Sequence, residues 1–257
     1  MNRIDKLFQS GKKDILSVYF TAGYPKLDDT VKIIKSLSEY GVDMIEIGVP
    51  FSDPMADGPV IQASGQQALN NGMTQKVLFK QLEDIRHTTD IPLVMMSYIN
   101  TAMQFGFKEY CENCAKVGID GLIIPDLPLE VFQADYEQHV KANSLKYIQL
   151  VTPETPDERI REIDSVSTGF VYMVSSASTT GAQKSFDDTK RQYFRHIQEM
   201  NLTNPTLVGF GVSNRETFRA AADYSRGCII GSAFIKLLGT CGSIDEAVKT
   251  LIKNVKG

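Results

Sequence analysis

The chain has 257 residues, of which 42% are hydrophobic and 23% are charged. This composition is typical of a globular protein and supplies ample apolar material for a core. The net charge of −4 and the scattered basic residues exclude the electrostatic footprint of a nucleic-acid-binding protein. No window approaches the roughly 18 uninterrupted apolar residues of a membrane span, and residues 1–14 lack the apolar core of a secretory signal. We therefore expect a cytoplasmic protein with no membrane partner.

Short apolar runs rich in Val, Ile and Tyr alternate with amphipathic stretches along the whole chain. Nearly continuous apolar runs are typical of strands that are buried on both faces of a parallel sheet. In chain order, the predicted strands are 16–21, 44–49, 93–99, 121–126, 147–152, 170–175, 206–210 and 228–231. The predicted helices that follow them are 27–40, 74–87, 107–117, 129–143, 156–166, 187–200, 214–224 and 243–255.

Eight strands that are each followed by a helix indicate an α/β protein with a (β/α)8 TIM barrel. The rival architecture is an open doubly wound sheet. The alternation is complete and no break in composition divides the chain, which favours the barrel as a single domain over residues 1–257. Residues 1–10 are predicted to form an extra N-terminal helix that plugs the N-terminal end of the barrel.

Active sites of such barrels form at the carboxyl ends of the strands. The three histidines, His87, His139 and His196, lie instead in predicted helices. No lysine lies within or at the carboxyl end of a predicted strand, since Lys146 precedes the fifth, so a Schiff-base mechanism lacks its amine. We expect no metal site, because a lone Cys-x-x-Cys in a predicted helix, at 111–114, supplies too few ligands.

Glu46 is the strongest candidate for catalysis, since apolar strand residues flank it on both sides. If Glu46 faced the helices, its carboxylate would be buried without a partner, at a free-energy cost of several kcal/mol. Facing the barrel mouth, it would lie in a partly desolvated cavity that raises its pKa and suits general acid–base work. The alternative is a structural glutamate that forms a salt bridge with a neighbour at the strand end.

The following loop contains two further carboxylates, Asp53 and Asp57, among three prolines and two bracketing glycines, Gly48 and Gly58. Prolines stiffen such a loop and glycines permit sharp turns. An aspartate in this setting serves either the chemistry or a turn in which it bonds its own backbone. Residue types and spacing alone do not separate these roles for the two aspartates.

Glycines near the ends of the last three strands predict a phosphate site. Barrels frequently bind phosphate through the loops after strands seven and eight and the N-terminus of a short extra helix. Gly211 follows strand seven, Gly231 and Ser232 close strand eight before the apolar stretch 233–238, and Gly181 follows strand six. The small polar segment 176–186 is predicted to be a lid over the mouth.

The run Glu-Ile-Gly-Val-Pro-Phe-Ser-Asp-Pro-Met-Ala-Asp-Gly-Pro-Val-Ile-Gln at 46–62 is similar to the signature of the tryptophan synthase α subunit family. The resemblance extends to 20–25, 125–128, 209–211 and 231–232. It implies a lyase that cleaves indole-3-glycerol phosphate into indole and D-glyceraldehyde 3-phosphate. It also implies an α2β2 heterotetramer in which the β subunit uses pyridoxal phosphate to join indole to L-serine, giving L-tryptophan, with no cofactor in this chain.

The resemblance also assigns individual residues. Glu46 corresponds to the catalytic glutamate and Asp57 to the aspartate that stabilises the indole nitrogen, whereas Pro50 and Asp53 correspond to the loop that contacts the β subunit. The implied substrate-binding residues are Tyr19, Tyr98, Tyr172, Thr180, Gly181, Phe210, Gly211, Gly231 and Ser232. The lid departs from the family, which usually has a further glycine and often an arginine where this chain has Ser178 and Ser176.

Two alternatives belong to other classes of function. A sugar-phosphate isomerase of histidine biosynthesis would need acidic residues at the ends of strands one and five, where this chain has Thr21 and Thr152. A barrel kept only as an allosteric or indole-channelling partner of a β subunit would not retain both carboxylates. Cleavage of indole-3-glycerol phosphate needs no lysine or metal, since the indole ring itself accepts the electrons.

Overall fold

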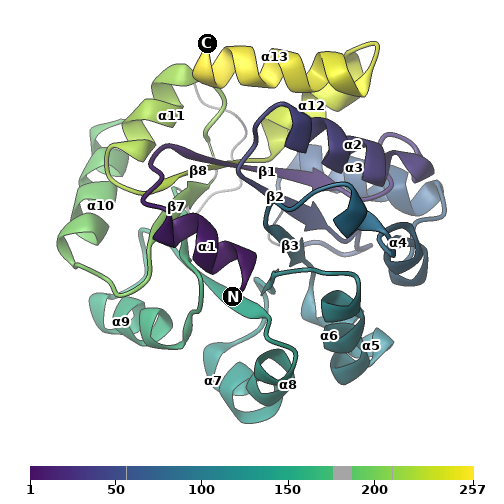
Figure 1. The fold of residues 1–257 in the computed structure, drawn as a ribbon. Coiled ribbons are helices and arrows are strands. Elements are labelled where there is room, and N and C mark those ends of the chain that lie inside the picture. The colour runs from purple at the N-terminus through teal and green to yellow at the C-terminus, as the bar shows by residue number, and fades with distance from the viewer. Residues whose placement is uncertain (56, 176–186, 210) are drawn as a thin grey trace.

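The computed structural model describes residues 1–55, 57–175, 187–209 and 211–257. Within these residues, eight parallel strands close into a barrel in chain order, with β8 paired to β1 (Figure 1). This confirms the predicted (β/α)8 barrel. The strands are β1 (Ile15–Thr21), β2 (Met44–Gly48), β3 (Leu93–Met96), β4 (Gly121–Ile123), β5 (Lys146–Val151), β6 (Val171–Val174), β7 (Thr206–Gly209) and β8 (Gly227–Ile230).

Helices surround the barrel, and α1 lies across one end of it (Figure 1). The first half of the chain contributes α1 (Arg3–Gln9), η1 (Leu27–Asp29), α2 (Thr30–Glu39), α3 (Pro59–Asn70), α4 (Gln75–Gln81), η2 (Ile85–His87), α5 (Ile99–Phe105) and α6 (Phe107–Lys116). The second half contributes α7 (Leu129–Val131), η3 (Phe132–Tyr136), α8 (Glu137–Ala142), α9 (Asp157–Val166), α10 (Asp188–Glu199), α11 (Arg215–Ala222), α12 (Ser232–Thr240) and α13 (Ile244–Lys256).

Side chains at alternate strand positions fill the barrel, because successive residues of a strand point to opposite faces. Ile15 and Met44 belong to a buried cluster inside the barrel, together with residues from the other strands. The same alternation places Ser17 and Tyr19 of β1 and Glu46 of β2 on the inner face. In the register of the two strands, Tyr19 lies opposite Glu46 and Ser17 lies opposite Met44. A larger cluster fills the space between the barrel and its helices.

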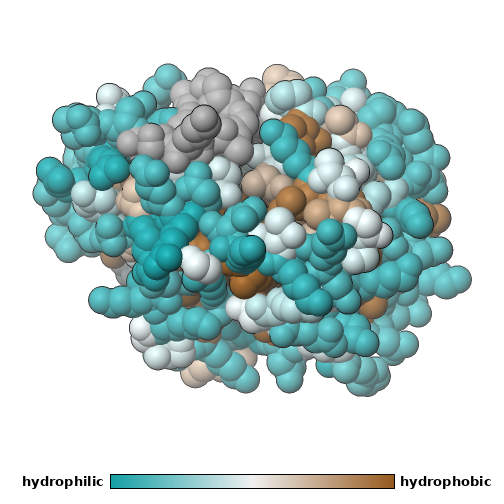
Figure 2. Space-filling view, turned by 90° about the horizontal axis from the view of Figure 1, so that it is seen from above, coloured by the Kyte–Doolittle hydropathy of each residue, from teal (hydrophilic) through white to brown (hydrophobic). Residues whose placement is uncertain are grey.

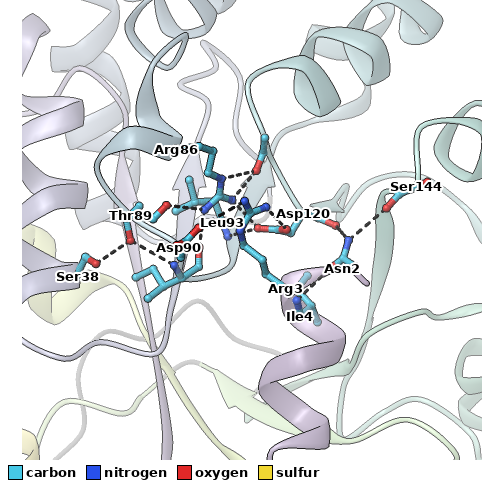
Figure 3. A network of polar contacts seen from close by, with 12 residues as sticks. Asn2, Arg3, Ile4, Ser38, Arg86, Thr89, Asp90, Leu93, Asp120 and Ser144 are labelled. Atoms are coloured by element: carbon cyan, nitrogen blue, oxygen red, sulfur yellow. Dashed lines mark hydrogen bonds and ion pairs between the residues drawn. The ribbon is translucent and has the colours of Figure 1, made fainter.

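Helix α1 closes the N-terminal end of the barrel, as predicted. Ile4 is fully buried in the inner cluster, and the Asn2 amide donates a 2.8 Å hydrogen bond to the backbone oxygen of Asp120. The buried Asp120 carboxylate also accepts a 3.3 Å bond from Arg3 and a 2.6 Å bond from Arg86. This network ties α1 to the beginning of β4 and to the helical layer (Figure 3), so the site must lie at the other end.

Several predicted boundaries were wrong. The sequence pattern missed α3, whose polar glutamines and internal Gly65 weaken the amphipathic signal, and it missed α5, which begins at Ile99 inside the strand predicted at 93–99. The predicted helix 74–87 divides into α4 and η2, and 129–143 divides into α7, η3 and α8. Lys146 is the first residue of β5 rather than a residue preceding it, and its ammonium pairs with Asp5 at 2.7 Å.

The face of the molecule shown in the space-filling view is mainly polar. Hydrophilic residues cover most of that face, and hydrophobic residues form small patches near its centre (Figure 2). None of the described helices is both long enough and apolar enough to cross a membrane.

Candidate active site

A cavity opens at the carboxyl ends of the strands, between the beginnings of α3 and α12. Six of the predicted site residues line it: Tyr19, Asp57, Tyr172, Gly211, Gly231 and Ser232. The remaining lining residues are mostly apolar and include Val60, Ile61, Met96, Val212 and Ile229, with Gly58 and Pro59 at the start of α3. An apolar wall with a few convergent polar groups is typical of a small-molecule site.

Glu46 lies inside the barrel and is fully buried. Its Oε1 accepts a 3.0 Å hydrogen bond from the Ser17 hydroxyl, and its buried Oε2 has no hydrogen-bond partner among the described residues. Burial raises the pKa of Glu46 to about 8, and the Ser17 hydrogen bond opposes this shift. The sequence alternative of a structural salt bridge is therefore wrong for the described residues, since the partner of the carboxylate is a neutral hydroxyl.

The structure separates the two aspartates that the sequence left equivalent. Asp57 lines the cavity, and its Oδ2 accepts a 3.1 Å hydrogen bond from the Tyr98 hydroxyl. Burial raises the pKa of Asp57, whereas the bond from Tyr98 lowers it. Asp53 is exposed and bonds the neighbouring Ser52 hydroxyl. The carboxylate with access to the cavity is thus Asp57.

Two tyrosines lie at the barrel mouth, and each packs against a glycine of the neighbouring strand. Tyr19 and Tyr172 are almost fully buried, and desolvation raises the pKa of each hydroxyl, so both stay neutral at physiological pH. A Cβ at Gly48 would overlap the Tyr19 hydroxyl, and a Cβ at Gly209 would overlap that of Tyr172. Gly48 is the last residue of β2 and its φ is not positive. The structure therefore shows a second role for this glycine, which is to leave space for the Tyr19 ring.

The part of the cavity wall at the beginning of α12 carries the features of an anion site. Gly231 is the N-cap of α12, and Ser232 is its first residue, so the short helix predicted after strand eight is present. The free backbone N–H groups and the helix dipole of such an N-terminus favour a phosphate. Gly211, which adopts a φ of +74°, lines the same cavity. The remaining predicted residues Thr180, Gly181 and Phe210, and the lid with Ser176 and Ser178, lie outside the described residues.

The residues set aside in the sequence occupy structural positions. Across the described ranges, no group of three or more His, Cys, Asp or Glu side chains is arranged to hold a metal ion. Cys111 and Cys114 are buried on α6, and burial raises the pKa of the Cys111 thiol to about 12. His196 lies on α10 and contacts Asp157 at 2.8 Å. The Thr21 side chain is buried, and its hydroxyl bonds that of Ser64 at 2.7 Å.

Sequence reasoning missed Ser17 and the apolar wall formed by Met96 and Ile229. Ser17 and Glu46 are 29 positions apart, and only the pairing of β1 with β2 brings them together. The usable signal was the alternation along β1, which places a small hydroxyl residue on the same face as Tyr19. Met96 and Ile229 carry no such signal, because apolar strand residues line a cavity and fill a core equally well.

The comparisons with known proteins agree with this arrangement. A family model described as tryptophan synthase alpha chain matches residues 6–256. The tryptophan synthase alpha chain of Parabacteroides distasonis is 55% identical over 256 residues, covering 100% of both chains. That of Bacteroides thetaiotaomicron is 57% identical over 238 residues, covering 93% of each chain. In the solved tryptophan synthase complex from Pyrococcus furiosus, a chain of 33% identity superposes with a TM-score of 0.87, covering 96% of this chain and 99% of that one. The chain belongs to the tryptophan synthase alpha chain family.

Proposed function

We propose that this chain, acting as a single domain over residues 1–257 in the cytoplasm, is a lyase that cleaves indole-3-glycerol phosphate into indole and D-glyceraldehyde 3-phosphate. The observation that carries the proposal is the convergence of three features at one barrel mouth. Glu46 is buried inside the barrel opposite Tyr19, which lines the cavity. A second carboxylate, Asp57, lies in the cavity wall, and the N-terminus of α12 lies in the same wall. These features match an indole ring that must be protonated and a phosphate that must be held.

Glu46 acts as the acid and then as the base. With a pKa of about 8 it is protonated at neutral pH, so it delivers a proton to the indole carbon that bears the side chain. The resulting carboxylate then removes the proton from the adjacent side-chain hydroxyl. The electrons of that O–H bond form the aldehyde, the carbon–carbon bond breaks, and its electrons return to the ring nitrogen. The balance needs no other reactant, because the glutamic acid is restored.

Asp57 stabilises the positive charge that develops at the ring nitrogen after protonation. A preorganised carboxylate in a water-poor cavity is worth more than one in water, and the Tyr98 hydroxyl fixes its Oδ2. The phosphate lies at Ser232 and Gly231, with Gly211 beside it, where backbone N–H groups meet the dianion. Tyr19 and Tyr172 pack against the substrate between these two ends.

We propose that the partner is a tryptophan synthase β subunit in an α2β2 assembly, which receives indole and uses its own pyridoxal phosphate to join indole to L-serine. The related archaeal chain comes from a tryptophan synthase complex. On this chain, Met55 in the loop after β2 is 92% exposed and Met103 on α5 is 54% exposed. The loop that holds Met55 also holds the exposed Asp53 and the buried Pro50, which are the residues that the family resemblance places against the β subunit.

The test is indole release from indole-3-glycerol phosphate, first by the chain alone and then with the β subunit added. Glu46→Gln is expected to fold and to lose turnover by at least ~10²-fold, the usual contribution of a general acid–base group. Asp57→Asn is expected to be severely impaired while still binding inorganic phosphate. Glu83→Gln, which alters an exposed carboxylate, is the matched control. Near-wild-type turnover of Glu46→Gln would refute the assignment.

A further inference from the structure

We propose that Ser17 is a positioning residue for the proton transfers of Glu46: its hydroxyl holds Oε1, so that Oε2 is the oxygen that exchanges protons with the substrate. This inference rests on the proposed function and extends it to a residue outside the cavity. It depends on the contacts of the Glu46 carboxylate and on the place of Ser17 in β1.

Ser17 lies one inner layer deeper than the cavity. Tyr19, two positions later on β1, lines the cavity, whereas Ser17 and Glu46 are both fully buried beneath the cavity wall. In the strand register it lies opposite Met44, toward the end of the barrel that α1 closes. Glu46 lies opposite Tyr19 and therefore nearer the mouth than Ser17. Since the Ser17 hydroxyl bonds Glu46, we expect any effect of Ser17 on catalysis to pass through Glu46.

The two oxygens of Glu46 differ in their surroundings. Oε1 accepts the 3.0 Å bond from Ser17, and Oε2 is buried without a hydrogen-bond partner among the described residues. A carboxyl group held at one oxygen loses much of its rotational freedom, so the other oxygen has a defined direction for proton transfer. The free oxygen is also the more basic one, since no donor stabilises charge on it.

No cation among the described residues pairs with Glu46 to support its ionised form. The titratable groups that interact with it are the Tyr19 hydroxyl on β1 and the Tyr172 hydroxyl on β6. Both tyrosine hydroxyls stay neutral at physiological pH. Ser17 is thus the donor that opposes burial, and its removal is expected to raise the pKa of Glu46 further.

The matched variants are Ser17→Val and Ser17→Thr, because both add similar volume at a β-strand position and only threonine keeps the hydroxyl. Since the acid form of Glu46 begins the reaction, activity falls as pH rises through its pKa. For Ser17→Val we expect this alkaline limb of kcat/KM to move upward by about one pH unit, the size expected for loss of one hydrogen bond to a charged group. We also expect kcat to fall about tenfold, because a misaligned and weaker acid transfers its proton less readily, with KM changed by less than about twofold. Ser17→Thr should resemble the wild type.

The inference would be overturned if the alkaline limb of the kcat/KM profile did not move in Ser17→Val. It would also be overturned if this limb moved equally in both variants. A second readout does not depend on turnover: the titration of the Glu46 carboxyl carbon, followed by NMR in ¹³C-glutamate-labelled full-length chain and assigned with Glu46→Gln. The valine variant should titrate at higher pH than the threonine variant, and coincident titrations contradict the proposal. If the wild type releases no indole, the proposed function fails; if it does and the titrations coincide, only the role of Ser17 fails.

Discussion

The buried acid inside the barrel should make the stability of this protein depend on pH in a defined window. Glu46 has a pKa of about 8 in the folded chain and an ordinary value of 4.5 when solvated. Between these values the folded state binds more protons than the unfolded state, so the free energy of unfolding falls as pH rises from about 4.5 to about 8. Below this window the group is neutral in both states, and above it the destabilisation is complete and constant.

The magnitude follows from the size of the pKa displacement. A difference of about 3.5 units, at 1.36 kcal/mol per unit, corresponds to about 5 kcal/mol. This is comparable to the entire stability of a marginal domain, which is about 5–15 kcal/mol. For a chain of this length, such a loss corresponds to a melting temperature lower by on the order of 10 °C or more.

Glu46→Gln isolates this contribution, because glutamine has nearly the same shape, can still accept the Ser17 hydrogen bond and does not ionise. Urea unfolding, followed by far-ultraviolet circular dichroism, gives the free energy of unfolding at several pH values for both proteins. The variant minus wild-type difference should grow by about 5 kcal/mol between about pH 4 and pH 9. Glu83→Gln should show no such growth, since its carboxylate is exposed. Parallel pH profiles for wild type and Glu46→Gln would refute the reasoning.

Three further substitutions test other parts of the structure. Gly48→Ala places a Cβ against the Tyr19 hydroxyl, so it should cost about 1–3 kcal/mol in urea unfolding and weaken substrate binding measured as KM. Arg86→Met leaves the buried Asp120 carboxylate without its closest cation, and the free energy of unfolding should fall by about 3–5 kcal/mol with KM unchanged. Ser232→Asp adds a negative charge at the start of α12, so KM should rise at least tenfold, whereas the melting temperature should hold or increase because helix N-termini favour anions.

The fold was predictable because its signal is repeated many times. Eight buried apolar runs separated by amphipathic stretches specify a parallel barrel even when single boundaries are wrong. Helix α3 escaped detection because its buried face is made of small residues such as Ser64, Gly65 and Ala68, which carry little hydrophobic contrast. The end of β3 escaped because Tyr98 and Ile99 favour β structure, although α5 already begins at Ile99.

The candidate site was predictable only in part, for a different reason. Glu46 stands out in a single strand, since a carboxylate among apolar residues demands an explanation. Asp57 and Asp53 differ only in which of them reaches the cavity, and that depends on the path of the loop and on Tyr98. The role of Gly48 depends on a ring from the neighbouring strand, and that of Ser17 depends on strand register. Contacts between strands depend on which strands pair and in what register, and the sequence of a single strand does not determine either.

In the proposed mechanism, the buried position of Glu46 serves binding as well as proton transfer. The cavity contains Asp57, and the proposed substrate brings a phosphate dianion, so a second ionised carboxylate beneath them would repel both. Burial keeps Glu46 neutral at physiological pH and therefore removes this repulsion, while it supplies the acid that begins the reaction. Once Glu46 has given up its proton, the positive indole ring lies beside two carboxylates and is stabilised by both. Burying Glu46 thus lowers the stability of the fold and raises the pKa of this carboxyl group. The group therefore becomes charged only when the substrate carries the opposite charge.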